Sequence, residues 1–177
     1  MVEGRSPVSA RQRIAAGLLT MSLAGFGAWK VNEGYTDVAV IPTKGDVPTI
    51  GHGSTRWEDG TRVRMGDTIT RPRAEVLARN LLTQDEKAFA ASLPGVKLHQ
   101  AEFDLYMDFV GQYGIGNWRA SSMRRDLLTG NYAQACHNLL KYKFAAGYDC
   151  STPDNKRCWG VWERQLKRHQ QCMAEQP

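Results

Sequence analysis

The chain has 177 residues, of which 42% are hydrophobic and 23% are charged, and its formal net charge is +5. This length and composition are those of a folded protein with one domain and a substantial core. The positive charge favours a polyanionic partner such as a cell wall, a nucleic acid or an anionic membrane. Because many proteins use such charge only for solubility, we do not expect nucleic-acid binding from charge alone.

The N-terminus has the pattern of an export signal. Arg5, Arg11 and Arg13 precede an uncharged stretch from Ile14 to Trp29, as in the basic and apolar regions of such signals. The stretch is shorter than the roughly 20 apolar residues of a membrane-spanning helix. Arginines before it predict a cytoplasmic N-terminus and export of the remainder. We expect a signal-anchor segment over residues 1–30 and a folded domain over residues 31–177.

Three fates of this segment remain open: cleavage, permanent anchoring, or marginal anchoring that can end with release from the bilayer. Cleavage after Gly27 places Gly25 and Gly27 at the small-residue positions of a signal-peptide site. The alternative, a buried amphipathic core helix, is disfavoured because residues 14–29 have no polar face.

Residues 31–55 are rich in Val, Ile, Thr, Gly and Pro, which predicts short strands and turns. Lys44, Gly45 and Asp46 form a suitable hairpin turn, and residues 56–67 predict a polar loop or a second small hairpin. A helix begins at Thr70, the expected N-cap, with Pro72 in its first turn, and ends before Pro94.

Helical spacing of apolar residues predicts further helices over 99–110, 121–128, 132–142 and 161–173. Gly111, Gly114 and Gly116 are expected to interrupt the first of these. The layout is a small β-hairpin region followed by a helical bundle, which is an α+β fold.

The four cysteines all lie in the last quarter of the chain, and none forms a C-x-x-C pair, which argues against zinc. Two disulfides in an oxidising compartment are the favoured interpretation, and four buried thiols are the alternative. Three pairings exist; the spacing favours Cys150–Cys158 across a short loop and Cys136–Cys172 between two helices.

The segment NEGYTDVAVIPTKGDVPTIGHGST resembles the catalytic stretch of phage lysozymes of glycoside hydrolase family 24. That stretch has E-G, then an acid or cysteine, then T-[IV]-G-x-G; here these elements are Glu33-Gly34, Asp46 and Thr49 to Gly53. QAEFDLYMDFVGQYGIGNWRASSMRRDLLTGNY is similar to the family's central helix pair, and residues 160–172 to its closing helix. The likeness covers residues 31–173 and implies a lysozyme-like fold and a cofactor-free muramidase that cleaves peptidoglycan.

The resemblance assigns Glu33 as the catalytic acid, Asp46 as the base or electrostatic partner, and Thr49 as the group that positions water for an inverting reaction. A general acid must stay protonated, so Glu33 should be partly desolvated. In the family the second acid lies about nine residues after the glutamate, which here falls near Pro42 and Thr43. Asp37, expected at a helix end or loop, is therefore the rival of Asp46. The alternatives are a surface acid beside a glycine for Glu33 and turn chemistry for Asp46.

His52 and Gln112 are the expected substrate-binding residues. We expect His52 in the cleft wall, and the alternative for it is a catalytic base. The alternative for Gln112 is a cap at the break between helices. The sequence contains no phosphate-binding loop or metal-ligand pattern, so we expect neither a metal nor a cofactor.

The apolar stretch ends four residues before Glu33, so anchoring would keep Glu33 at the membrane surface, away from Thr49. This arrangement resembles the signal-anchor-release endolysins, which are exported inactive and activated by release. It implies that residues 14–29 first hold the protein in the host inner membrane and that release then delivers it to the periplasm. The sequence has no pattern that indicates oligomerisation, so we expect a monomer. Some of these endolysins are activated by thiol exchange with a cysteine in the anchor. No cysteine precedes Cys136 in this sequence, so we do not expect that route.

Three rival functions remain: a lytic transglycosylase, which needs one carboxylate; a chitin-type glycosidase; and an inactive membrane-anchored protein that binds walls.

Overall fold

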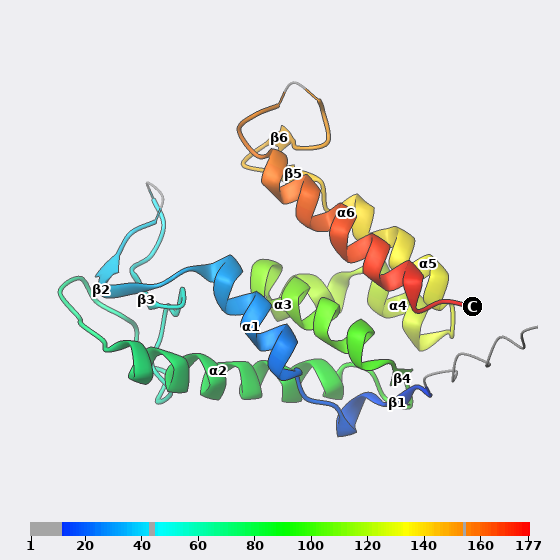
Figure 1. Ribbon diagram of the computed structural model, residues 1–177, viewed down its shortest axis with the longest axis horizontal. Helices are drawn as coiled ribbons and strands as arrows, with labels where there is room; N and C mark the ends of the chain where they lie inside the picture. The colour runs from blue at the N-terminus through cyan, green and yellow to red at the C-terminus, as the bar shows by residue number, and fades with distance from the viewer. Residues whose placement is uncertain (1–11, 43–44, 154) are drawn as a thin grey trace, which may run out of the picture.

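The computed structural model describes residues 12–42, 45–153 and 155–177, and within them six α-helices and three small antiparallel sheets form an α+β fold (Figure 1). A small lobe holds the hairpin of β2 (Thr36–Val40) and β3 (Thr49–Gly51). A larger lobe holds α3 (Gln100–Ala120), α4 (Ser122–Leu128), α5 (Tyr132–Asn138) and α6 (Trp159–Ala174). The predicted order, a hairpin region followed by a helical bundle, is confirmed.

The long helix α2 (Arg71–Ala91) belongs to both lobes and runs below α1 in Figure 1. Thr70 caps it as predicted, because its side chain accepts a hydrogen bond from the backbone N–H three residues later. Leu77 lies in the small core with Ile50, whereas Leu82 and Phe89 lie in the large core. One continuous helix therefore fixes the distance between the two lobes.

In the small lobe, β2 pairs with β3 in a register that places Thr36 opposite Gly51 and Val40 opposite Thr49, with an irregularity between. The predicted turn includes Lys44, which lies outside the described residues, as does Thr43. Residues 56–67, predicted as a polar loop or a second small hairpin, form a loop with one isolated antiparallel bridge, between Arg56 and Arg62.

Residues 14–29 fold differently from the single apolar stretch that the sequence led us to expect. The strand β1 (Ile14–Ala15) pairs with β4 (Lys97–Leu98), a 3₁₀ turn η1 (Ala16–Leu18) follows, and α1 (Leu23–Glu33) begins inside the stretch. Among the described residues, no helix is long and apolar enough to cross a membrane. Arg5 and Arg11 lie outside those residues.

This N-terminal segment packs into the large core instead of standing apart from it. Ala16, Leu19, Met21 and Phe26 are all buried there. Burial as one amphipathic helix, which we did not expect, would require a polar helical face that residues 14–29 lack. A strand, a turn and a short helix bury the same apolar side chains without needing a polar helical face.

In Figure 1, α6 starts beside the small sheet of β5 (Phe144–Ala145) and β6 (Tyr148–Asp149) and runs down to the C-terminus. Cys136–Cys172 joins α5 to α6, and Cys150–Cys158 closes the loop before α6, which are the pairings that the spacing favoured. Of the three glycines expected to break α3, only Gly114 leaves helical geometry, with φ of 82°. The helical geometry resumes after this kink, so α3 ends at Ala120 and not near residue 110.

Candidate active site

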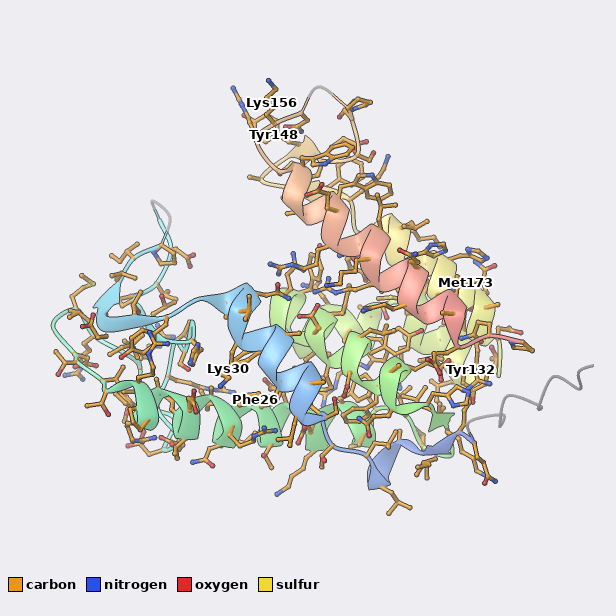
Figure 2. All side chains as sticks on the ribbon, in the orientation of Figure 1. Phe26, Lys30, Tyr132, Tyr148, Lys156 and Met173 are labelled. Atoms are coloured by element: carbon orange, nitrogen blue, oxygen red, sulfur yellow. A yellow bond between two sulfur atoms is a disulfide. The ribbon has the colours of Figure 1, made fainter. Side chains whose placement is uncertain are left out.

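Glu33 is the last residue of α1, and Gly34 ends the helix with φ of 73°, a conformation that favours glycine. The N–H of Gly34 donates to the carbonyl of Lys30 at 3.0 Å. Lys30, labelled in Figure 2, also pairs with Glu75 of α2 at 2.8 Å, so the end of α1 is tied to α2. A carboxylate at a helix C-terminus faces the negative end of the helix dipole, which favours its protonated form.

The surroundings of Glu33 are those required of a general acid. Its side chain is half-buried, and burial raises the pKa of its carboxyl above the ordinary value. Arg164 and Arg168 oppose this shift, while Asp108 adds to it. A carboxyl with a raised pKa keeps its proton nearer to neutral pH and can donate it to a leaving oxygen.

A cavity of about 360 Å³ opens beside Glu33 where the two lobes meet. Its walls come from the end of α1, the loop after β3, one face of α2, and α3 near its glycines. The polar residues that line it are Glu33, His52, Ser54, Thr55, Arg56 and Asp85. This is the size of a site for one or two sugar rings or another small ligand.

The loop after β3 reaches closely over the acid. A Cβ atom at Gly53 would lie 3.1 Å from Oε2 of Glu33, so the backbone of this loop borders the carboxyl. His52 is buried, and its Nδ1 hydrogen-bonds the carbonyl of Gly34 at 2.5 Å. Its Nε2 is buried without a partner among the described residues. His52 therefore joins the loop to the end of α1 and forms part of the cavity wall.

Asp46, Asp37 and Thr49 do not line the cavity beside Glu33. Asp46 is exposed in the hairpin, where its carboxylate accepts from the N–H of Val47 at 2.8 Å. The Thr49 hydroxyl donates to the carbonyl of Val40 at 3.4 Å. Asp37 lies within β2, and not at a helix end or loop as the sequence led us to expect, because β2 begins directly after Gly34 and Tyr35.

Gln112 lies on α3 and also stays outside the cavity lining, which includes its neighbours Gly111 and Gly114. Its Oε1 accepts a hydrogen bond from Nη1 of Arg168 at 2.8 Å. In this structure Gln112 therefore connects α3 to α6.

Sequence reasoning missed several cavity residues, among them Trp29, Arg56 and Asp85. Trp29 precedes Glu33 by one helical turn, so the i, i+4 spacing could have placed both on one face of α1; we had assigned Trp29 to the membrane segment. Asp85 follows Leu82 by three residues on α2, which also puts it on the cavity face. Burial raises the pKa of Asp85, and the charge of Arg56 opposes that shift.

Comparison with known proteins gives a consistent result. The model of the family described as phage lysozyme matches residues 30–168. The endolysin of Salmonella phage P22 is 31% identical over 128 residues, covering 72% of this chain and 86% of the relative. The SAR-endolysin of Enterobacteria phage PA-2 is 29% identical over 151 residues, covering 80% and 86%. The crystal structure of a P22 lysozyme mutant superposes with a TM-score of 0.69 at 27% identity, covering 88% of this chain and 99% of that one.

Proposed function

The chain belongs to the phage lysozyme family, and we propose that it is an endolysin that cleaves the β-1,4 bond between N-acetylmuramic acid and N-acetylglucosamine in peptidoglycan. The observation that carries this proposal is Glu33, a half-buried carboxyl with a raised pKa at the edge of the cavity between the lobes. Net charge of +5 suits an anionic cell wall.

In the proposed reaction Glu33 protonates the glycosidic oxygen, and a second carboxylate activates water on the opposite face of the sugar ring. Inversion requires the two carboxyl groups to be roughly 6.5–9.5 Å apart, which leaves room for that water. We assign the second role to Asp46 and the positioning of water to Thr49, both on the hairpin of the small lobe. Because Asp46 lies outside the cavity lining, the hairpin must close over the substrate for this role.

The direct test of these assignments compares wall clearing by three variants with wild type. Glu33→Gln should abolish clearing, because an amide cannot supply the proton. Asp46→Asn should lower kcat strongly, and Asp37→Asn, a charge-matched change on the same hairpin, should leave it close to wild type. Clearing by Glu33→Gln at the wild-type rate would refute the assignment of the acid. Full activity of Asp46→Asn with loss in Asp37→Asn would transfer the second role to Asp37.

Asp46→Asn also separates the proposed hydrolase from a lytic transglycosylase, which would need Glu33 alone and should lose little activity. A chitin-type glycosidase would release products from chitin oligomers as readily as from walls. An inactive wall-binding protein would bind walls without clearing them.

We further propose that His52 contacts the bound glycan from the cavity wall. Its ring is held by the carbonyl of Gly34 and lines the cavity. Gln112 would act on substrate only through its link to Arg168.

The proposed localisation is inferred from the sequence of the N-terminal segment. We propose that residues 14–29 first hold the protein in the host inner membrane, with its N-terminus in the cytoplasm, and that release delivers an active monomer to the periplasm. A relative is a SAR-endolysin, and the sequence of the segment is weakly apolar. The burial of Ala16, Leu19 and Phe26 in the core supports a released form that differs from the anchored one, since these side chains cannot occupy a bilayer and the core together.

Cell fractionation tests this proposal. Full-length, inactive protein should sediment with membranes before depolarisation and become soluble, uncleaved and active afterwards. A mature N-terminus at Ala28, found by mass analysis, would contradict release and replace it with ordinary secretion.

A further inference from the structure

A buried arginine of α6 lies close behind the catalytic end of α1. Arg168 is only 2% exposed, and burying a guanidinium is costly unless it is paired and hydrogen-bonded. Its Nε and Nη2 donate to the carboxylate of Asp108 on α3 at 2.7 and 2.5 Å, and Nη2 also donates to the Asp108 carbonyl at 3.1 Å. Its Nη1 donates to Gln112. The guanidinium group of Arg168 is therefore fully engaged with two side chains of α3, those of Asp108 and Gln112.

The same carboxylate reaches α1. The side-chain amide of Asn32 donates to Oδ1 of Asp108 at 3.5 Å, and Asn32 directly precedes Glu33. A series of contacts thus runs from Arg168 on α6, through Asp108 on α3, to the last turn of α1. Both charged residues also border a groove of about 640 Å³ between these three helices, and Trp29 separates this groove from the cavity of Glu33 by lining both.

We propose that Asp108 and Arg168 are positioning residues for the catalytic acid: their buried ion pair holds the end of α1 against α3 and α6 and neutralises the charge behind Glu33. This inference rests on the proposed function of Glu33. Neither residue lines the cavity, so both act through Glu33 and not on substrate.

The charges around Glu33 determine whether a substitution favours its protonated or its ionised form. Arg164 and Arg168 face it from α6 and Asp108 from α3, while Lys30 on its own helix is paired with Glu75. His52, Arg56 and Asp85 face it from the cavity walls. Replacing Asp108 by Asn leaves Arg168 without its carboxylate partner, and it removes the negative charge that faces Glu33 from α3 beside Arg164 and Arg168. The two remaining guanidinium groups are then no longer balanced by that charge. They then favour the ionised Glu33, which has no proton to donate.

The test is the pH profile of kcat and KM on soluble glycan fragments for Asp108→Asn, Arg168→Gln and the double variant. Activity falls at high pH as Glu33 loses its proton. In Asp108→Asn this basic limb should move to lower pH, by about 0.5 unit or more, with kcat reduced more than KM is raised. In Arg168→Gln it should move to higher pH, and in the double variant it should return toward wild type.

Glu163→Gln is the matched control, since it removes one negative charge from an exposed position of α6 and should leave the limb in place. Arg168→Gln alone can lose stability because it leaves Asp108 half-buried and unpaired, so Asp108→Asn and the double variant carry the result. Equal losses at every pH without a shift of the limb would overturn the proposal, as would a shift matched by Glu163→Gln. Survival of the limb in Glu33→Gln would instead refute the proposed function.

Discussion

At the scale of single residues, Glu33 shows the conflict between activity and stability. Its position at a helix C-terminus, half-buried beside Gly53, suits proton donation but makes the ionised form costly. The raised pKa means that the folded protein holds this proton more tightly than the unfolded chain. Folding stability attributable to Glu33 is therefore lost as pH rises from its unfolded pKa, near 4.5, through its higher folded pKa.

Glu33→Gln should consequently be more stable than wild type at pH 7, by about 1 kcal/mol. The amide keeps the shape of the side chain and has no buried charge. Urea unfolding at pH 7 and at pH 4 measures the difference, which should shrink toward zero at pH 4 because Glu33 is then protonated in both states. A variant less stable than wild type at pH 7 would contradict the description of its environment.

The motif identified Glu33 because the helix end, glycine and hairpin follow one another locally. The other cavity groups come from distant elements: Arg56 lies 23 residues and Asp85 52 residues beyond Glu33 in the chain. Only the packing of α2 against the loop after β3 brings them together. Residue spacing within one helix or strand cannot predict such a contact between distant elements. The position of Asp46 relative to the cavity could not be predicted from the sequence either, because it depends on the conformation of the hairpin.

At the scale of elements, helices with clear start signals were predicted well. Thr70 and Pro72 defined the start of α2, and apolar spacing located α3, α4 and α6 within a few residues except at the end of α3. The N-terminal segment was the main difference. Its apolar composition suits a membrane and a protein core alike, and the contacts that hold it in the core come from helices 65 to 89 residues away.

The contact between α1 and α3 gives a test of element packing. A Cβ at Gly111 would lie 2.6 Å from Nε1 of Trp29, an atom that is buried without a partner among the residues described. Gly111→Ala should therefore displace α1, lowering stability by about 2 kcal/mol and reducing kcat because Glu33 moves with the helix. Thermal unfolding and wall clearing measure both effects.

Trp29→Phe supplies the control, because the smaller ring removes the atom that would clash. Added to Gly111→Ala, it should recover part of the lost stability. If Gly111→Ala proves as stable and active as wild type, α1 does not pack against α3 as described.

At the scale of the whole molecule, Arg13 near the N-terminus contacts Gln176 near the C-terminus. Arg13 donates to both oxygens of Glu102 at 3.0 and 2.9 Å and to Gln176 at 2.9 Å, and it lies over the ring of Tyr132, labelled in Figure 2. Burial raises the pKa of Glu102, but hydrogen bonds led by that from Arg13 outweigh it and lower the pKa overall. The stability that this pair contributes is present above the unfolded pKa of Glu102 and is lost as pH falls through the folded one.

Arg13→Met should cost about 3 kcal/mol, since it leaves a carboxylate whose side chain is 1% exposed without its cation. Arg125→Met, at a side chain that is 72% exposed, is the control and should cost little. Urea unfolding at neutral pH compares them. Equal effects of the two substitutions would show that the segment does not dock through Arg13.

We propose that the chain hydrolyses the glycan strand of peptidoglycan through Glu33. Mass analysis of the fragments that the purified protein releases from purified peptidoglycan tests it most directly. We predict fragments that end in reducing N-acetylmuramic acid, with none released by Glu33→Gln. Fragments ending in 1,6-anhydro-N-acetylmuramic acid, or equal release by Glu33→Gln, would contradict the claim.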